Sequence, residues 1–205
     1  MPLTNPIHPG EVVWTGENPG ILLKESDDGP FCAIALFFRI YYSPVGRGTA
    51  LLILEEPNDP VSLPKACNAL ICDSAELAAY IKKDFIEKLP VFAALPGYQA
   101  STVVALTESY PLGDPRTCYR EIIKTDALDI ELVWDQLSQP TALELPAELT
   151  GAKENELYTV LIESRDPTIN INGKRLRGNP VERIQAGIKT TTAFLYFSET
   201  WIRPA

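Results

Sequence analysis

The chain has 205 residues, 45% of them hydrophobic, and its 18 basic and 27 acidic residues give a net charge of −9. This length and composition predict one domain, residues 1–205, with a substantial core. The acidic balance argues against a nucleic-acid binder and against a protein that binds anionic membranes. No apolar run approaches the roughly 20 residues of a membrane-spanning helix.

Residues 31–54 predict a hairpin of two apolar strands, the segment around which the rest of the sheet is organised. Successive side chains of a strand point to opposite faces, so residues 31–42 have one uniformly bulky face that should bury in the main core. The other face is small at Ala33 and Ala35 and carries a cation at Arg39. Small side chains leave room above a sheet, so this face predicts either a closely packed element or a ligand pocket.

A main helix is predicted over about residues 73–89. Asp73 and Glu76 have the spacing of a capping box, and apolar residues then recur at helical intervals until a proline ends the run. A short second helix is predicted over about residues 180–186, because an asparagine cap, a first-turn proline and a glutamate precede a closing glycine there.

The remaining segments predict mostly antiparallel strands. Residues 127–135 alternate between apolar and charged side chains, and Asn172-Gly173 is a residue pair that two-residue hairpin turns favour. The last strand is predicted over residues 189–197. Together these elements predict an α+β, mostly antiparallel β fold, as a curled sheet or barrel-like single domain with one main helix and one short helix.

Several chemistries lack the residues that they need. His8 is the only histidine, which argues against a histidine-based triad or metal site. Cys67 and Cys72 have no second nearby pair with which to hold zinc. Because the N-terminus lacks the pattern of a signal peptide, the four cysteines predict reduced thiols in a cytoplasmic protein. We expect no metal and no cofactor.

The hairpin carries a family resemblance. Residues 37–46, Phe-Phe-Arg-Ile-Tyr-Tyr-Ser-Pro-Val-Gly, and the apolar residues 51–54 resemble the strand, S-P-V-G turn and strand of acetoacetate decarboxylase-like proteins. The resemblance implies a cone-shaped antiparallel β fold and, in active members, a lysine that forms a Schiff base in an apolar cavity. The glycine-phenylalanine-proline-lysine-lysine segment that carries this lysine is absent here. Lys124 is the lysine in the most comparable setting, and an exposed lysine at a strand end is the alternative interpretation.

Arg39 is the first candidate binding residue. A guanidinium on an otherwise apolar strand should be paired, because an isolated buried charge is costly. Its partner is either a glutamate of the fold, for which Glu55, Glu121 and Glu131 are the candidates, or a ligand carboxylate bound bidentately.

A basic segment near the C-terminus is the second candidate. It contains Lys174, Arg175, Arg177, Arg183 and Lys189 against a single acidic residue, Glu182. A basic hairpin that runs into a helix N-terminus favours an anion or an acidic partner. The alternative interpretation is solvated or structural charge.

Three functions remain open, and the sequence does not decide whether the protein is an enzyme. The leading one is a noncatalytic domain that binds a small anionic or apolar ligand in a pocket on the sheet, lined by Ala33, Ala35, Arg39, Tyr41 and Tyr119. The second is a decarboxylase-like lyase that uses Lys124. The third is an interaction subunit, within a homo-oligomer or a complex, that presents Lys174, Arg175, Arg177 and Arg183 to an acidic partner.

Overall fold

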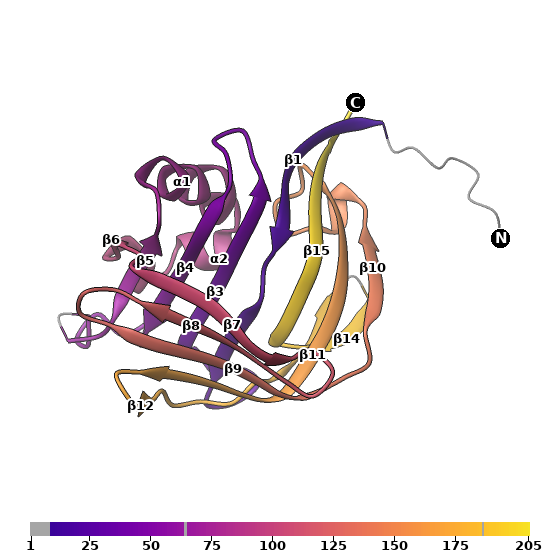
Figure 1. The fold of residues 1–205 in the computed structure, drawn as a ribbon. Coiled ribbons are helices and arrows are strands. Elements are labelled where there is room, and N and C mark those ends of the chain that lie inside the picture. Colours follow the sequence, from indigo (N-terminus) through magenta and orange to yellow (C-terminus); the bar gives the residue numbers. More distant parts are fainter. Residues whose placement is uncertain (1–8, 64, 186) are drawn as a thin grey trace.

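The computed structural model describes residues 9–63, 65–185 and 187–205, most of which lie in strands (Figure 1). The N-terminal half contributes β1 (Gly10–Glu17), β2 (Gly20–Lys24), β3 (Phe31–Tyr42), β4 (Gly48–Glu55), β5 (Asn68–Cys72) and β6 (Thr102–Ala105). The C-terminal half contributes β7 (Glu108–Asp114), β8 (Cys118–Lys124), β9 (Asp129–Leu137), β10 (Thr141–Leu145), β11 (Glu156–Ile171), β12 (Lys174–Arg175), β13 (Glu182–Gln185), β14 (Ile188–Thr191) and β15 (Ala193–Pro204). The predicted β-rich class with few helices is confirmed.

The helical segments are short. They are α1 (Ala75–Tyr80), the π-helical turn η1 (Ile81–Phe85), the 3₁₀ turn η2 (Ile86–Lys88), α2 (Pro90–Ala93), α3 (Pro96–Gln99) and the 3₁₀ turn η3 (Ala147–Leu149).

One long sheet holds most of the strands, in the order β6-β5-β4-β3-β1-β15-β11-β9-β8-β7. β2 pairs with β3 and β15, and β10 and β12 pair with β11. The strand pairs are antiparallel except for β5 and β6, which are parallel. β13 and β14 form a separate hairpin. β6 and β7 lie at the two ends of the path, although only Leu106 and Thr107 connect them in the chain.

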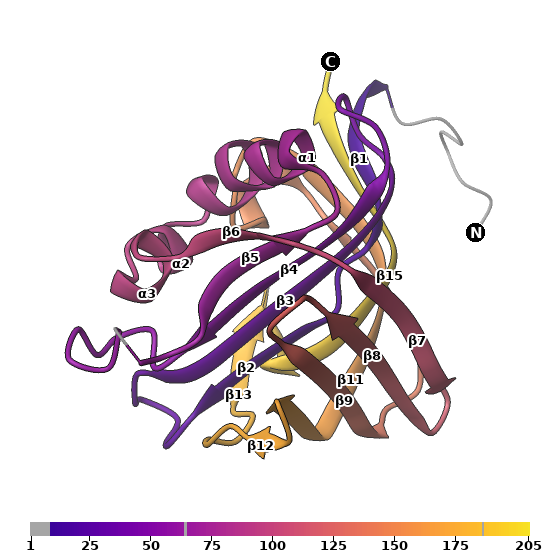
Figure 2. The same cartoon turned by 60° about the vertical axis from the view of Figure 1, so that its left-hand side comes forward.

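The sheet bends so that β8 and β9 lie across β3 and β4 (Figures 1 and 2). Side chains from these four strands share one buried cluster, to which β3 gives Phe37, β4 gives Ile53, β8 gives Ile123 and β9 gives Trp134. Burying these apolar surfaces against each other stabilises the bend, at roughly 25 cal/mol per Å² removed from water.

The helices cover the opposite face of β3 and β4 (Figure 2), over a second buried cluster. Phe85 of η1 belongs to this cluster. Its ring meets those of Trp14, Phe38 and Trp201 edge to face, at centroid distances of 5.7, 5.3 and 5.5 Å. This geometry favours aromatic pairs beyond their area of contact, so these rings tie the helical segments to β1, β3 and β15.

The two faces of β3 are buried in different cores. Its bulky face, which includes Leu36 and Phe38, is buried as predicted, and it packs under the helices. Its small face, which includes Ala33 and Ala35, packs toward β8 and β9. A strand covered on both faces needs apolar residues at nearly every position, which accounts for the unbroken apolar run in the sequence.

The main predicted helix is present over residues 75–88, but it is less regular than its spacing suggests. Its N-cap is Ser74, whose Oγ accepts a hydrogen bond from Leu77 N at 3.3 Å. The expected cap, Asp73, instead accepts from Thr49 N at 2.7 Å. Asp73 therefore ties the helix start to β4, and the adjacent serine takes the capping position.

The prediction of a short helix over residues 180–186 is wrong. Residue 186 itself lies outside the described residues. The segment forms the β13–β14 hairpin, in which Gly187 has φ +79°. Val181 N donates to Thr192 Oγ1 at 3.0 Å, and Thr192 N donates to Val181 O at 3.0 Å. This pairing with a segment eleven residues further along the chain keeps the backbone extended after Pro180, so the local cap signals are overridden by tertiary contacts.

Candidate functional site

Arg39 pairs with two glutamates of the fold. Its Nη2 donates to both carboxylate oxygens of Glu121 at 2.8 Å, and its Nη1 donates to Glu17 Oε2 at 2.5 Å. Tyr119 donates to Glu121 Oε1 at 2.6 Å, and Tyr41 donates to Glu17 Oε1 at 3.0 Å. The structure thus brings Arg39, Tyr41 and Tyr119 together around the protein's own carboxylates. Of the three glutamates that the sequence suggested as partners of Arg39, the structure pairs it with Glu121.

Ala33 and Ala35 lie deeper, in the cluster between β3, β4, β8 and β9. Both have an exposed fraction of 0% and share this cluster with Ile130 and Trp134. The space above the two alanines is therefore occupied by side chains of the protein, and this face is closely packed there.

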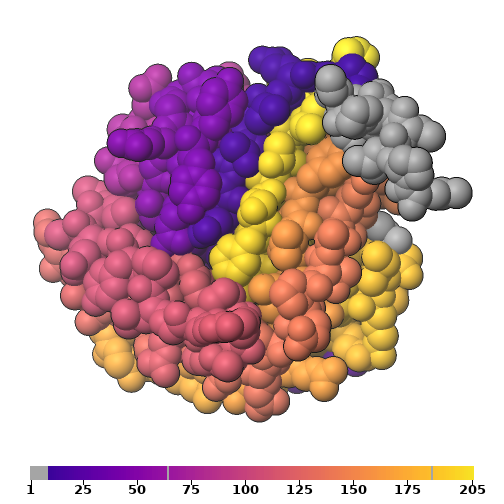
Figure 3. All heavy atoms as spheres, turned by 45° about the vertical axis from the view of Figure 1, so that its right-hand side comes forward, coloured from indigo at the N-terminus to yellow at the C-terminus, as the bar shows by residue number. Residues whose placement is uncertain are grey.

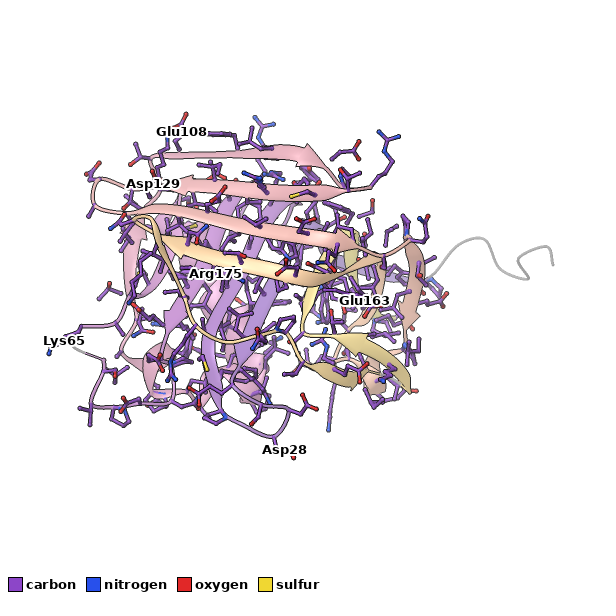
Figure 4. The ribbon with its side chains drawn as sticks, turned by 90° about the horizontal axis from the view of Figure 1, so that it is seen from below. Asp28, Lys65, Glu108, Asp129, Glu163 and Arg175 are labelled. Atoms are coloured by element: carbon purple, nitrogen blue, oxygen red, sulfur yellow. The ribbon has the colours of Figure 1, made fainter. Side chains whose placement is uncertain are left out.

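Four of the five basic residues in the C-terminal segment are paired with carboxylates. Figure 4 labels Arg175, which lies on β12, a strand that pairs with β11. Lys174 pairs with Glu55, Arg175 with Asp166, Arg177 with Glu25 and Glu56, and Lys189 with Glu182. Arg183 differs from these four in its surroundings, because it lines an apolar cavity.

Lys124 lies at the end of β8, with its Nζ 3.0 Å from Glu108 Oε2 and 5.7 Å from the ring centroid of Tyr110. Figure 4 shows Glu108 and Asp129 at the same end of their strands. The hydrogen bond to Glu108 raises the pKa of the Lys124 amine. A lysine nucleophile needs a lowered pKa, so the surroundings of Lys124 act in the opposite direction.

An apolar cavity of about 200 Å³ lies under the helical cover, against β15. β15 crosses one face of the molecule as the long yellow band of Figure 3. Four of its side chains, Phe194, Tyr196, Glu199 and Trp201, form one wall, and we call the site the β15 cavity. Other walls come from Asn18, Leu36, Phe92, Leu145, Leu157 and Arg183.

A β-bulge in β15 turns Glu199 toward this cavity. Phe194 and Tyr196 face the core under the helices, so strict alternation would turn residue 199 to the other face. Ser198 has φ +52°, and the pairing with β11 shifts register near it. The extra residue changes the phase of the strand, and Glu199 and Trp201 take the cavity side. The sequence prediction ended this strand at residue 197 and missed Glu199.

Glu199 is a fully buried carboxyl in a mostly apolar wall. Its Oε1 accepts hydrogen bonds from Trp201 Nε1 at 2.5 Å and from Asn18 Nδ2 at 3.3 Å. Burial raises the pKa of Glu199 to about 8, and these two hydrogen bonds oppose the rise. The carboxyl is therefore mostly protonated at neutral pH. It then carries little negative charge with which to balance a neighbouring cation.

Arg183 is half-buried on β13, with its guanidinium 4.8 Å from the ring centroid of Phe194. Its Nη2 donates to Gln185 Oε1 at 2.9 Å, and its Nε donates to Thr190 Oγ1 at 3.3 Å. Tyr196 also donates to Gln185 Oε1, at 2.8 Å. Within residues 9–63, 65–185 and 187–205, no carboxylate lies within ion-pairing distance of Arg183. The cavity therefore holds a cation whose hydrogen-bond partners are all neutral.

Among the described residues, no three His, Cys, Asp or Glu side chains come together as metal ligands; His8 lies outside those residues. No helix in the described part of the chain has the length and apolar character needed to cross a bilayer.

Comparison with protein-family models, with curated proteins and with solved structures finds no match to this chain. Function must therefore be inferred from the residues of the β15 cavity themselves.

Proposed function

We propose that the protein binds a small organic anion with an apolar body in the β15 cavity, with Arg183 contacting the anionic group. The observation that carries this proposal is that, among the described residues, no carboxylate lies within ion-pairing distance of Arg183. Lys174, Arg175, Arg177 and Lys189 each pair with a carboxylate, whereas the hydrogen bonds of Arg183 go to an amide and a hydroxyl.

A half-buried guanidinium that forms no ion pair is costly to desolvate, and the charge of Glu163 acts on Arg183 only from beyond ion-pairing distance. Burial lowers the pKa of Arg183, yet arginine stays protonated at any physiological pH. A charged group in an apolar site is normally paired. A ligand carboxylate would supply that pairing, through charge-assisted hydrogen bonds that match the planar geometry of the guanidinium.

The size of the cavity favours a small molecule. An engineered apolar cavity of about 150 Å³ in another protein holds benzene, and the β15 cavity measures about 200 Å³. Its walls are mostly aliphatic and aromatic, from residues such as Leu36, Phe92, Leu145 and Leu157. Apolar walls with a few polar anchors are typical of small-molecule sites, and a ring or branched chain with one anionic group matches both features.

The two alternative functions have no comparable support. A lyase based on Lys124 would need an amine with a lowered pKa in an apolar site, and Lys124 is instead paired with Glu108. An interaction surface built on Lys174, Arg175 and Arg177 would have to replace carboxylates that these cations already contact.

Calorimetric titration with benzoate and with its uncharged counterpart cumene tests the proposal. Wild type should bind benzoate, and Arg183→Gln should weaken that binding by about tenfold to a hundredfold, the value of a charge-assisted hydrogen bond. Cumene binding should not change in this variant. Arg177→Gln, a matched change at an exposed and paired arginine, should leave both affinities unchanged.

Two outcomes would contradict the proposal. One is the absence of benzoate binding to folded wild-type protein. The other is benzoate binding that survives Arg183→Gln but is lost in Arg177→Gln, which would move the anion site to the outer surface near Glu56.

A further inference from the structure

The β15 cavity has a second polar pair, apart from Arg183. Asn18 and Glu199 both line it and have exposed fractions of 6% and 0%. In the part of the chain that the structure describes, Glu199 Oε2 and Asn18 Oδ1 have no hydrogen-bond partner. Buried polar atoms are nearly always satisfied, and leaving one unpaired costs about 1–3 kcal/mol. Two such atoms on neighbouring side chains therefore point to a ligand group that satisfies both.

The hydrogen bonds already present show which atom donates and which accepts. The indole N–H of Trp201 can only donate, so Glu199 Oε1 is an acceptor, and the proton of the neutral carboxyl lies on Oε2. The same Oε1 accepts from Asn18, which identifies the amide nitrogen as the atom facing Glu199. Oε2–H is thus a free donor, and Asn18 Oδ1 is a free acceptor.

We propose that Glu199 and Asn18 form a subsite for a primary carboxamide or a lactam, in which Glu199 Oε2–H donates to the ligand carbonyl oxygen and Asn18 Oδ1 accepts from the ligand N–H. These two ligand classes present both atoms on one side. An open-chain secondary amide in its usual trans form places them on opposite sides. An undissociated carboxylic acid has the same pattern, but it is ionised at neutral pH.

This inference rests on the proposed function, since the same cavity must admit a ligand. Together the two polar ends define a small anion that also carries a carboxamide or lactam group, with the anion at Arg183 and the amide at Glu199. Tyr196 lines the same cavity and donates to Gln185 Oε1, which also accepts from Arg183. Burial raises the pKa of Tyr196 to about 12, so its hydroxyl remains neutral across the range in which Glu199 titrates.

Three neutral molecules of nearly equal shape test the subsite without involving Arg183. Benzamide offers an acceptor and a donor, acetophenone offers the acceptor alone, and cumene offers neither. Wild type should bind benzamide, and Glu199→Leu or Asn18→Leu should weaken that binding by about tenfold or more. The binding of acetophenone should be weakened by Glu199→Leu alone, and the binding of cumene should be weakened by neither substitution.

Glu199→Gln is the conservative variant. Its amide keeps the oxygen that accepts from Trp201 and places an N–H₂ donor where Oε2–H stands, so benzamide binding should persist. Glu121→Gln changes an equally buried glutamate outside the cavity and controls for a general loss of packing. It should leave the affinity for all three molecules unchanged.

Wild-type protein offers a test that needs no variant. The affinity for benzamide should fall as the pH rises through about 8, where Glu199 loses its proton, while the affinity for cumene should stay constant. Trp201 and Asn18 donate hydrogen bonds to Glu199, and the other polar side chains that line the cavity are Thr150, Arg183, Gln185 and Tyr196. None of these six groups titrates near pH 8.

The outcomes separate the two proposals. Benzoate binding that depends on Arg183, together with benzamide binding that is indifferent to Glu199, Asn18 and pH, would overturn the amide subsite alone. Benzamide binding that depends on Glu199 and Asn18, without benzoate binding, would overturn the anion proposal alone. If folded protein binds none of the four molecules, both proposals fail.

Discussion

Trp201 Nε1 donates a hydrogen bond to Glu199 Oε1 at 2.5 Å from a position two residues along the same strand. Both side chains face the β15 cavity because the bulge at Ser198 precedes them. The indole satisfies one oxygen of the buried carboxyl, and the second oxygen is left for the interior of the cavity. A local change in strand register thus places a protonated acid in an apolar wall.

The first prediction concerns the proton of Glu199. The folded-state pKa of about 8 exceeds the ordinary value of 4.5, so between pH 4.5 and 8 the native state holds a proton that the unfolded state has released. Native stability should therefore fall as the pH rises through this window, by up to about 1.4 kcal/mol per pH unit. Glu199→Gln removes this dependence and should gain stability over wild type from pH 5 to pH 8.

Urea unfolding at several pH values measures this difference. Glu148→Gln, at an exposed position of η3, is the control and should follow wild type throughout. A Glu199→Gln variant whose stability relative to wild type does not change between pH 5 and pH 8 would contradict a raised pKa.

The second prediction compares two arginines that pair with glutamates. Arg39→Met leaves Glu121, with an exposed fraction of 0%, without its counter-charge, and should lower the free energy of unfolding by about 3–5 kcal/mol. Arg177→Met breaks pairs on the surface and should cost about 0–1 kcal/mol. Denaturant unfolding of both variants checks this order, and equal losses would mean that Glu121 is not stabilised by Arg39.

Much of the fold around β3 can be predicted from sequence. The alternation of residue size along β3 indicates its bulky core face, and Asn172-Gly173 forms a turn with positive φ at both positions. The predictions from these features are correct because the features depend on local backbone preferences and on the two-residue period of side chains along a strand. Arg39 could also be placed with Glu121 among three candidates, because a cation on an apolar strand needs a partner.

The cavity could not be predicted, for two physical reasons. A bulge changes which residues face the core, and Ser198 gives no glycine signal for its positive φ, so Glu199 falls outside the expected pattern. Arg183 belongs to a basic run in sequence, but the β13–β14 hairpin turns it inward while the other cations stay on the surface. The sequence signal available for this site was an acidic residue, Glu199, shortly after the aromatic residues of the last predicted strand.

The third prediction tests the bulge. Ser198 occupies the left-handed region at φ +52°, which costs an ordinary residue roughly 1–2 kcal/mol and glycine almost nothing. Ser198→Gly should therefore be as stable as wild type or slightly more so. Ser198→Val should be at least about 1 kcal/mol less stable than Ser198→Gly, because β-branched residues tolerate this conformation poorly. Equal urea midpoints for the two variants would show that the bulge is not required.

The fourth prediction uses two leucines of β10. Leu145 lines the β15 cavity, whereas Leu143 is buried in the same core outside it. Leu145→Phe should fill part of the cavity, weaken benzoate binding by about tenfold and change stability little. Leu143→Phe enlarges a buried side chain that does not line the β15 cavity, and it should cost about 1–3 kcal/mol while leaving benzoate affinity unchanged. Calorimetry and urea unfolding of both variants measure the contrast, and the reverse pattern would place the open volume elsewhere.

The most direct test of a ligand site at the β15 cavity is where benzoate lies when it is bound. In protein with labelled leucine and isoleucine methyl groups, NMR detects transfer of magnetisation from the benzoate ring to methyl groups in contact with it. The account predicts transfer to Leu36, Leu145 and Leu157, which line the cavity. Two results would contradict it. One is transfer instead to Ile53 and Leu132, which lie in the cluster shared by β3, β4, β8 and β9, and the other is transfer to none of these methyl groups while benzoate is bound.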